Sequence, residues 1–297
     1  MNKHRLCIFG EVLFDHFPDG RRVLGGAPFN VAWNLCALGA DPLLISRVGT
    51  DGNALSVRSA MQVWGMSTAG LQSGPEAPTG LVQVTFEDGE PAYEIVRPAA
   101  WDAIAPPEPA PACGLLYHGS LALRGAVSRQ TLEGLRDTRP ATVFVDVNLR
   151  APWWEGDVVR SLLDGADWVK LNDDELDRLA PAGGSAESRA RRLMERHGVR
   201  RLLLTGGSRG AELITAGGDR LATRPAGRAE VVDTVGAGDA FSSVMILGIS
   251  RDWPLQLSLD RAQQFASAVV GQRGATVHDR RFYRPFAEAW AAAPTAS

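Results

Sequence analysis

The sequence predicts an α/β protein with a mostly parallel central sheet, and three observations lead to this fold class. Apolar runs of strand length are continuous rather than alternating, which is typical of strands buried on both faces. Helix-like stretches separate these runs, and strand and helix alternate from residue 111 to the end. The 297 residues, 45% of them hydrophobic and 22% charged, suffice for a large core with a smaller appendage.

Six apolar runs bounded by Gly, Asp or Asn are the predicted strands of this sheet. They are residues 5–10, 42–49, 114–120, 142–148, 167–172 and 200–207. Two stretches between them, 30–40 and 186–198, predict helices that end at a glycine. In the first helix, Val31 and Leu35 fall on one face, and Gly39 is the expected terminator.

One stretch departs from this alternation and predicts a small antiparallel flap. Residues 79–96 contain two strand-like runs joined by Asp88-Gly89, a strong hairpin signal. In the first run, the apolar Leu81 and Val84 flank polar residues, as expected for a half-buried strand.

The flap is expected to belong to a single catalytic domain that spans residues 1–297. It would be formed by about 11–24 and 76–104, because residues 14–26 can supply a second strand pair. The Pro-rich stretch 105–114 then leads back into the sheet.

Charge and cysteine content exclude several classes of function. The net charge of −3 gives no basic field for nucleic acid or an anionic membrane. The three cysteines, Cys7, Cys36 and Cys113, are odd in number and far apart, which favours reduced thiols over a disulfide framework. No apolar stretch approaches membrane-spanning length, and the five histidines lack metal-ligand spacing. We therefore expect a soluble, cytoplasmic protein without a zinc site.

Residues 233–241, with the sequence DTVGAGDAF, are the strongest candidate for phosphate chemistry. A P-loop requires Gly-Lys-Ser/Thr, and neither of the two lysines, Lys3 and Lys170, follows a glycine. A dinucleotide-binding loop has a third glycine where this chain has Phe241, which counts against a dehydrogenase.

What remains is a glycine loop that opens a buried helix. Residues 229–234 resemble the end of a strand, and residues 240–249 are almost uniformly apolar. The first N–H groups of such a helix lack internal partners and attract anions, and glycines let an anion approach closely. Asp239 is then either a helix cap or a catalytic group.

The same nine residues resemble the C-terminal signature of the ribokinase-like (PfkB) carbohydrate kinases. The resemblance covers roughly residues 5–290 and implies a three-layer α/β/α fold with a β flap that acts as a lid. It implies that Gly236, Ala237 and Gly238 form an anion hole for the transferring phosphoryl group. Asp239 would be the base that accepts the proton of the sugar hydroxyl.

A second resemblance concerns the sugar. The segment GGAPFN is similar to the family's di-glycine element, so Gly25 and Gly26 would form the hinge and Asn30 would bind sugar hydroxyls. Asp15 matches an acidic residue that binds the sugar near the start of family members. Carboxylates and amides suit this role because they bind polyols well. A tight turn at the glycines and a helix cap at Asn30 are the structural alternatives.

Further similarities concern ATP and its metal. The family's N-x-x-E element corresponds to Asn172 and Glu175, which would order Mg²⁺ through water, although the pair also fits a capping box. The T-x-G-x-x-G turn beside ATP corresponds to the segment TGGSRG. The residues implied there are Thr205, Gly207, Ser208 and Gly210, together with Gly238 of the anion hole.

Two arginines are substrate candidates. The element D-x-N-x-R, here with Asn148 and Arg150, resembles the fructokinase and ketodeoxygluconate-kinase branch, and a guanidinium suits substrate oxygens. Arg97, at the end of the flap hairpin, is either a substrate contact or a solvated surface charge.

The family commonly binds a monovalent cation such as K⁺ beside the anion hole. The resemblance implies that Asp233 and the carbonyls of Val235 and Gly274 form part of this site. His278 stands near the place where a small hydroxyl residue can contribute a ligand, which counts against full cation dependence.

We therefore predict an ATP- and magnesium-dependent sugar kinase, most similar to fructokinases. A 2-keto-3-deoxygluconate kinase is the first alternative, because Arg97 and Arg150 could bind an acidic sugar. A nucleoside kinase and a non-catalytic sugar or nucleotide sensor are weaker alternatives. The expected partners are a small sugar and ATP, without nucleic acid or membrane. The exposed edge of the flap favours a homodimer.

Overall fold

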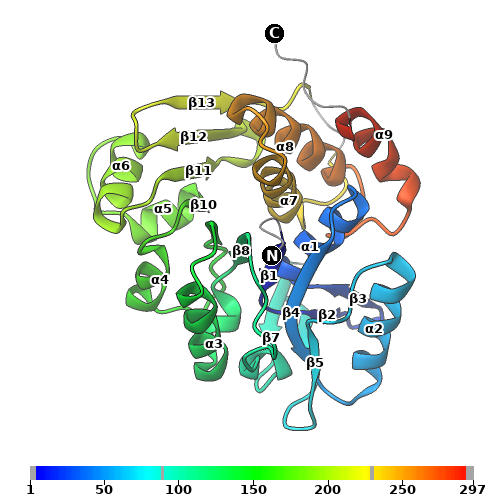
Figure 1. Ribbon diagram of the computed structural model, residues 1–297. Coiled ribbons are helices and arrows are strands. Elements are labelled where there is room, and N and C mark those ends of the chain that lie inside the picture. Colours follow the sequence, from blue (N-terminus) through cyan, green and yellow to red (C-terminus); the bar gives the residue numbers. More distant parts are fainter. Residues whose placement is uncertain (1–4, 88–89, 228–230, 292–297) are drawn as a thin grey trace.

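A nine-stranded sheet forms the centre of the protein in the computed structural model, which describes residues 5–87, 90–227 and 231–291 (Figure 1). The strand order is β13-β12-β11-β10-β9-β8-β1-β4-β5. The strands are β1 (Leu6–Phe9), β4 (Pro42–Val48), β5 (Leu71–Ser73), β8 (Leu115–His118), β9 (Thr142–Asp146), β10 (Trp168–Asn172), β11 (Arg201–Thr205), β12 (Ala211–Thr215) and β13 (Arg220–Thr223). From β5 to β11 all neighbours pair in parallel, and the six predicted strands are confirmed.

The strict alternation of strand and helix stops at Thr205, contrary to the sequence expectation. Strands β12 and β13 continue from β11 as antiparallel neighbours. The expected strand end at 229–234 is also wrong for its described part, because Val231 and Val232 are exposed and in no strand. The backbone N–H groups of Val232 and Asp233 donate instead to the carbonyl of Val270. This apolar stretch therefore runs along a helix end and not within a sheet.

Helices cover both faces of the sheet and give the three layers. One face carries α1 (Ala27–Ala37), α2 (Gly52–Trp64), α7 (Ala237–Ser250), α8 (Leu255–Val270) and α9 (Arg280–Ala291). The other carries α3 (Ala126–Asp137), α4 (Gly156–Leu163), α5 (Asp173–Leu179) and α6 (Ala186–His197). Alternate residues of β1 point to opposite faces of the sheet. Leu6 and Ile8 pack in the core on one face, and Cys7 and Phe9 pack in the core on the other. The continuous apolar runs thus reflect burial on both faces.

The two predicted helices are confirmed, with small shifts at their ends. Helix α1 begins three residues before the predicted start, and Gly39, just after it, has φ 84°. Helix α6 ends at Gly198, which takes the left-handed conformation that glycine tolerates best.

Strands β2 (Leu13–His16), β3 (Arg22–Gly25), β6 (Gly80–Glu87) and β7 (Glu90–Ile95) form the flap, in the order β3-β2-β6-β7. It consists of two antiparallel hairpins joined by a parallel pairing of β2 with β6. In β6 the buried positions are Val82 and Val84, whereas Leu81 lies on the other side. Leu81 and Val84 therefore lie on opposite faces of β6, because strand faces repeat every two residues. The turn residues Asp88-Gly89 lie outside the described residues.

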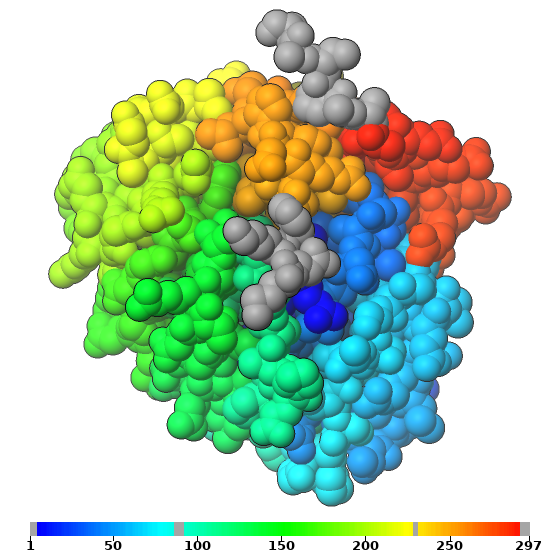
Figure 2. Space-filling model, viewed as in Figure 1, coloured from blue at the N-terminus to red at the C-terminus, as the bar shows by residue number. Residues whose placement is uncertain are grey.

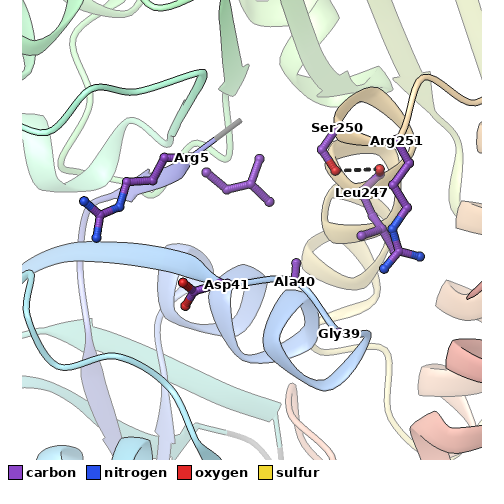
Figure 3. Close-up of a pocket in the computed structure, with 8 residues that line it drawn as sticks. Arg5, Gly39, Ala40, Asp41, Leu247, Ser250 and Arg251 are labelled. Carbon is purple, nitrogen blue, oxygen red and sulfur yellow. Dashed lines mark hydrogen bonds between the residues drawn. The ribbon is translucent and has the colours of Figure 1, made fainter. Parts of the chain in front are cut away.

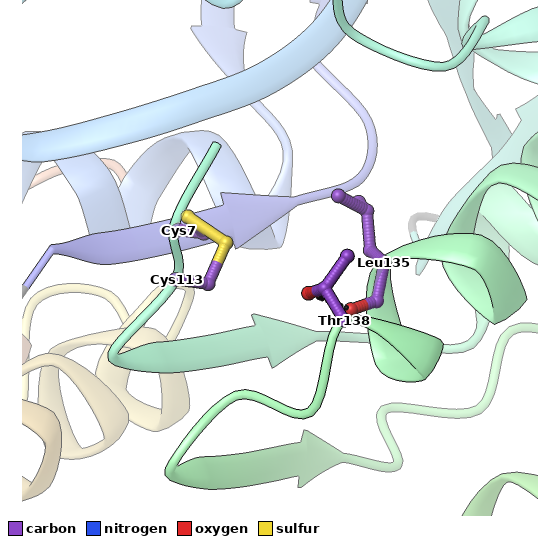
Figure 4. Close-up of a disulfide and its surroundings, with 4 residues drawn as sticks. All are labelled: Cys7, Cys113, Leu135 and Thr138. Carbon is purple, nitrogen blue, oxygen red and sulfur yellow. Dashed lines mark hydrogen bonds between the residues drawn. A yellow bond between two sulfur atoms is a disulfide. The ribbon is translucent and has the colours of Figure 1, made fainter. Parts of the chain in front are cut away.

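Two of the three cysteines form a disulfide, which corrects the expectation of reduced thiols. Cys7 lies in β1 and Cys113 just before β8, and their Cα atoms are 5.7 Å apart (Figure 4). Cys36 is free and partly buried. Sequence distance misled the prediction, because residues 106 positions apart become neighbours when β1 and β8 pair. The expectation of a cytoplasmic location loses this support.

Helices from the first and last parts of the sequence pack against each other. Figure 2 shows the C-terminal helices, in orange and red, lying against the N-terminal part in blue. Helices α1 and α7 are in contact although about 200 residues separate them. None of the helices in the described ranges is long and apolar enough to span a membrane.

Candidate active site

The parallel strands place the candidate residues at one edge of the sheet. Asp146 ends β9, Asn172 ends β10 and Thr205 ends β11, with Asn172 directly opposite Thr205. Glu11 follows β1 at the same edge, because β1, β8 and β9 run in the same direction. The carboxyl ends of strands in an α/β sheet are where such folds bind ligands.

Helix α7 begins at this edge with the glycine loop. Gly236 is its N-cap with φ 81°, and no side chain caps this end. A Cβ atom at Gly236 would lie 2.4 Å from the Cα of Ala275, so only glycine fits there without a shift. Ala237 to Asp239 form the first turn, where N–H groups lack partners within the helix. The loop is thus suited to bind an anion.

Asp239 projects from this first turn toward α1. The amide Nδ2 of Asn30 donates to Asp239 Oδ2 over 2.8 Å. Burial raises the pKa of Asp239 to about 6, although Asn30 and the charge of Lys170 act in the opposite direction. Asn30 itself is buried, and its Oδ1 has no hydrogen-bond partner among the described residues. The acceptor Oδ1 of Asn30 and the weakly basic carboxylate of Asp239 are therefore close together.

The di-glycine segment joins the flap to α1. Gly25 ends β3 opposite Leu13, and Gly26 is the N-cap of α1 with φ 108°. A Cβ atom at Gly26 would lie 2.7 Å from the carbonyl oxygen of Glu11, so this position requires glycine. The structural alternative, that Asn30 is only a helix cap, is wrong, because the cap is Gly26, four residues earlier.

Asp15 and Arg150 lie at the flap side of the same region. Asp15 lies in β2, where burial raises its pKa to about 6 and the charge of Arg150 opposes that shift. The charge of Arg150 also lowers the pKa of Asp239 and of Glu11, so it is close enough to act on all three carboxylates. Arg97 is exposed, with its guanidinium 5.8 Å from the ring of Trp153.

Asn172 and Glu175 form the capping box that the sequence left as an alternative. Asn172 Oδ1 accepts from the Glu175 N–H over 2.9 Å, and Glu175 Oε2 accepts from the Asn172 N–H over 2.8 Å. Glu175 Oε1 accepts from the N–H of Leu149, the residue between Asn148 and Arg150. Glu175 is buried and has a raised pKa, caused by burial. It therefore connects α5 to the loop that carries Arg150.

A cavity of about 590 Å³ extends from the glycine loop along the C-terminal half of the sheet. The predicted nucleotide residues Thr205, Gly207, Ser208 and Gly210 line it, together with Gly238. Phe241, Ala266 and Val270 add an apolar wall. The structure thus brings the predicted nucleotide residues together around one cavity that ends at the helix start.

The three residues proposed for a monovalent cation also come together. Asp233 Oδ1 accepts from the N–H of Val235, and Oδ2 from the N–H of Gly274, both over 3.0 Å. The ring of His278 packs against the ring of Trp33, at 4.8 Å between centroids.

Comparison with known proteins gives the family. The pattern of the pfkB family carbohydrate kinases matches residues 4–280, which is most of the chain. The protein belongs to this family. It is an ATP-dependent carbohydrate kinase with the ribokinase-like fold, as the sequence predicted.

Two curated relatives are equally similar to this kinase. The fructokinase of Klebsiella pneumoniae is 31% identical, with 83% of this chain and 84% of the relative covered. The aminoimidazole riboside kinase of Salmonella typhimurium is also 31% identical, with 84% and 82% covered.

Solved structures agree in fold. A Xylella fastidiosa fructokinase with bound ATP has a TM-score of 0.78 at 25% identity, with 92% of this chain and 94% of that chain covered. An Arabidopsis thaliana ribokinase complexed with ribose and ATP has a TM-score of 0.79 at 22% identity, with 96% and 98% covered. The second likeness concerns the fold alone.

Sequence reasoning gave no role to several polar residues that the fold brings to this site. They are Glu11, Tyr117, Asp146, Lys170 and Ser242. Asp146 and Lys170 each interrupt an otherwise apolar strand run, and this interruption is the signal that could have identified them. Glu11 is buried, and burial raises its pKa to about 7.

A second cavity, of about 470 Å³, lies at the opposite end of α7 in this kinase. Figure 3 shows Arg5 on one side of it and Ser250 and Arg251 on the other. Helix α7 has 14 residues and is therefore about 20 Å long, so this cavity is remote from the glycine loop.

Proposed function

We propose that this kinase phosphorylates a hydroxyl group of a neutral sugar, with fructose as the first candidate. The observation that carries the proposal is the position of Asp239. It lies in the first turn of α7, beside the anion-binding loop and bonded to Asn30. The likeness to the Klebsiella pneumoniae fructokinase supports the choice of sugar.

In the proposed reaction, ATP occupies the cavity lined by Thr205 and Gly238, with its phosphates directed at the start of α7. The sugar lies between the flap and α1, where Asp15, Gly26 and Asn30 can bind its hydroxyls. Asp239 accepts the proton of the attacking hydroxyl as the oxygen–phosphorus bond forms. The bond from the γ-phosphorus to the bridging oxygen breaks, and ADP leaves. The N–H groups of Gly236 to Gly238 stabilise the phosphoryl group in transfer.

The cofactors follow from the same geometry. Both carboxylate oxygens of Glu175 already accept a backbone N–H, so this residue fits a magnesium ion through water and not as a direct ligand. Mg²⁺ would neutralise phosphate charge, and its preference for retained waters agrees with such a site. A monovalent cation beside Asp233, Val235 and Gly274 would add positive potential at the anion hole.

Two other substrates have a specific observation in their favour. An aminoimidazole riboside kinase is as similar to this chain as the fructokinase, which favours a riboside. The charge of Arg150 acts on Asp15, a proposed sugar ligand, which favours an acidic sugar such as 2-keto-3-deoxygluconate. An ATP-consumption screen over fructose, 2-keto-3-deoxygluconate, ribose, tagatose, adenosine and aminoimidazole riboside separates them. We expect the highest kcat/KM with fructose, and a higher value with another compound would replace it.

The role of Asp239 is tested with Asp239→Asn. We expect kcat to fall by about 10²–10⁴, the usual contribution of a general base, with little change in ATP affinity. Asp252→Asn is the matched control, because Asp252 is exposed just beyond the other end of the same helix. Near wild-type turnover in Asp239→Asn would refute the assignment.

We also propose a homodimer through the flap. Strands β3 and β7 are the open edges of the four-stranded sheet, and Tyr93 of β7 is 54% exposed. A free strand edge favours pairing with a second copy. Sedimentation of the wild type and of Tyr93→Lys should show a dimer that the substitution weakens, and a wild-type monomer at micromolar concentration would contradict the proposal.

A further inference from the structure

A buried ion pair lies directly beneath the glycine loop. Lys170 is in β10 and its side chain is 9% exposed, while that of Asp146 is 2% exposed. The Nζ of Lys170 donates to both oxygens of Asp146, over 2.9 and 2.8 Å. Removing two charges from water is costly, and such pairs contribute little to stability in general. The location of the pair therefore calls for another explanation.

Asp146 is held firmly by neutral groups from other elements. The hydroxyl of Ser242 in α7 donates to Asp146 Oδ2 over 2.7 Å, and the hydroxyl of Tyr117 in β8 over 3.3 Å. Burial lowers the pKa of Lys170, but the carboxylates of Asp146, Glu175 and Asp239 together raise it above its usual value, so Lys170 remains a cation. The result is an ammonium group with a fixed position.

That position is the floor of the anion hole. A Cβ atom at Gly238 would lie 3.3 Å from Lys170 Nζ, which places the ammonium next to the second glycine of the loop. An ammonium has three N–H groups, and the two bonds to Asp146 use two of them. Within the described ranges, no acceptor other than Asp146 bonds to Nζ. The cavity that holds the predicted nucleotide residues reaches Gly238.

The negative charge around Lys170 suggests a role for the third N–H of its ammonium group. Asp239, Asp146 and Glu175 crowd this edge of the sheet, and the carboxylates of Asp146 and Glu175 each shift the pKa of Lys170. A polyphosphate approaching this edge would meet net negative charge without a cation. Lysine is a compact point charge and a common phosphate ligand.

We propose that Lys170 completes the anion hole by binding a non-bridging oxygen of the phosphoryl group in transfer. This rests on the proposed sugar-kinase function. Asp146 is a positioning residue that keeps the ammonium aimed at the loop, and Ser242 and Tyr117 fix Asp146. A Cβ atom at Gly238 would press on the ammonium, which would have to shift by a few tenths of an ångström.

The test uses three variants of the full-length kinase. Lys170→Met removes the charge but leaves Asp146 buried without its partner, so it can also unfold the protein. The double variant Lys170→Met/Asp146→Asn removes both charges and keeps acceptors for Ser242 and Tyr117. Ser243→Ala is the matched control, because its buried hydroxyl bonds only to the carbonyl of Ala240 among the described residues.

We expect the Tm of the double variant to return toward the wild-type value from the lower value of Lys170→Met. Its turnover should not recover. Its kcat should stay about 10²–10³ below wild type, as for the loss of one donor to a developing anion. The affinity of the double variant for ADP with aluminium fluoride, a mimic of the transferring phosphoryl group, should fall together with its kcat. Affinity for AMP, which does not reach Gly238, should be unchanged. Ser243→Ala should behave as wild type.

Recovery of both Tm and turnover in the double variant would overturn the proposal and make the pair purely structural. Equal losses of AMP and ADP–aluminium fluoride affinity would overturn it as well, because they would indicate a distorted nucleotide cavity. Failure of the sugar-kinase proposal is a separate result. The wild type would then phosphorylate none of the compounds screened, while the ratio of the two nucleotide affinities would still report on Lys170.

Discussion

At the residue scale, the site combines carboxylates whose pKa values burial has raised. Asp239 and Asp15 both have pKa values of about 6, and Glu11 has one of about 7. Raised pKa values at a cleft are typical of groups that exchange protons. Lys170 and Arg150 are the basic groups that moderate Asp239. The chemistry of this edge therefore depends on a few charges held close together.

The pKa of Asp239 gives a prediction for the pH profile of activity. A general base must be ionised, so kcat/KM should fall about tenfold per unit as the pH drops below about 6. The measurement is the rate of ADP release at low sugar concentration from pH 4.5 to 8.5. Glu11→Gln should keep this acidic limb. Loss of the limb in that variant would assign it to Glu11 and not to Asp239.

The pKa of Glu11 gives a prediction for stability. Its pKa is 4.5 in the unfolded chain and about 7 when folded, so folding favours the protonated form. Its stabilising contribution is complete below pH 4.5 and is lost as the pH rises through 7. The loss is on the order of 3 kcal/mol.

Glu11→Gln cannot ionise, so its Tm should decline less than that of wild type between pH 5 and pH 8. Thermal unfolding at the two pH values measures this difference. Glu94→Gln, at an exposed position of the flap, is the control and should follow wild type. Parallel declines for wild type and Glu11→Gln would contradict the prediction.

At the scale of elements, the start of α7 carries the glycine loop that we propose binds the phosphoryl group. The cap residue Gly236 has a left-handed conformation and touches the backbone of Ala275. The chain after α8 thus holds the anion loop in place. Helix α1 contributes Asn30 to the same point from the other end of the sequence.

We predict that Gly236→Ala is far more damaging than Gly218→Ala. Both glycines have positive φ, which costs an alanine about 1–2 kcal/mol. Only Gly236 also meets other atoms, whereas Gly218 faces open space. Gly236→Ala should lower kcat by about a hundredfold or more through displaced N–H groups, while Gly218→Ala should lower Tm slightly and leave kcat intact. Steady-state kinetics and thermal melts of both variants decide this.

At the scale of the whole molecule, the flap and the sheet are connected by a long excursion of the chain. Between β1 and β8, which pair side by side, the chain builds the flap and also α1, β4, α2 and β5. The disulfide between Cys7 and Cys113 closes this excursion.

Closing so long a loop should stabilise the fold by about 2–4 kcal/mol. Cys113→Ser should therefore lower Tm by several degrees, and dithiothreitol should lower the Tm of wild type to that of the variant without affecting the variant further. Cys36→Ser is the control, since Cys36 is unpaired. An unchanged Tm in Cys113→Ser would mean that the bond does not form in solution.

The sequence by itself determined the class of fold and six strands of the central sheet. Continuous apolar runs can only be buried on both faces, and this alone predicts a covered parallel sheet. The motif at residues 233–241 located the glycine loop and the acidic residue, because helix starts of this kind have a short, local signature. The residues from 205 to 210, predicted for the nucleotide from their resemblance to a T-x-G-x-x-G turn, line one cavity, and their role stays a prediction.

The tertiary structure decided everything that depends on distant residues meeting. The pairing of β1 with β8 created the disulfide that spacing had argued against. The meeting of β8, β9, β10 and α7 created the network of Tyr117, Asp146, Lys170 and Ser242. Asp146 and Lys170 stand out in the sequence only as polar interruptions of apolar strand runs, and nothing local shows that they meet. The charges and hydroxyls of this network acquire a partner, and so a chemical role, only when the sheet forms and the carboxyl ends of its strands converge.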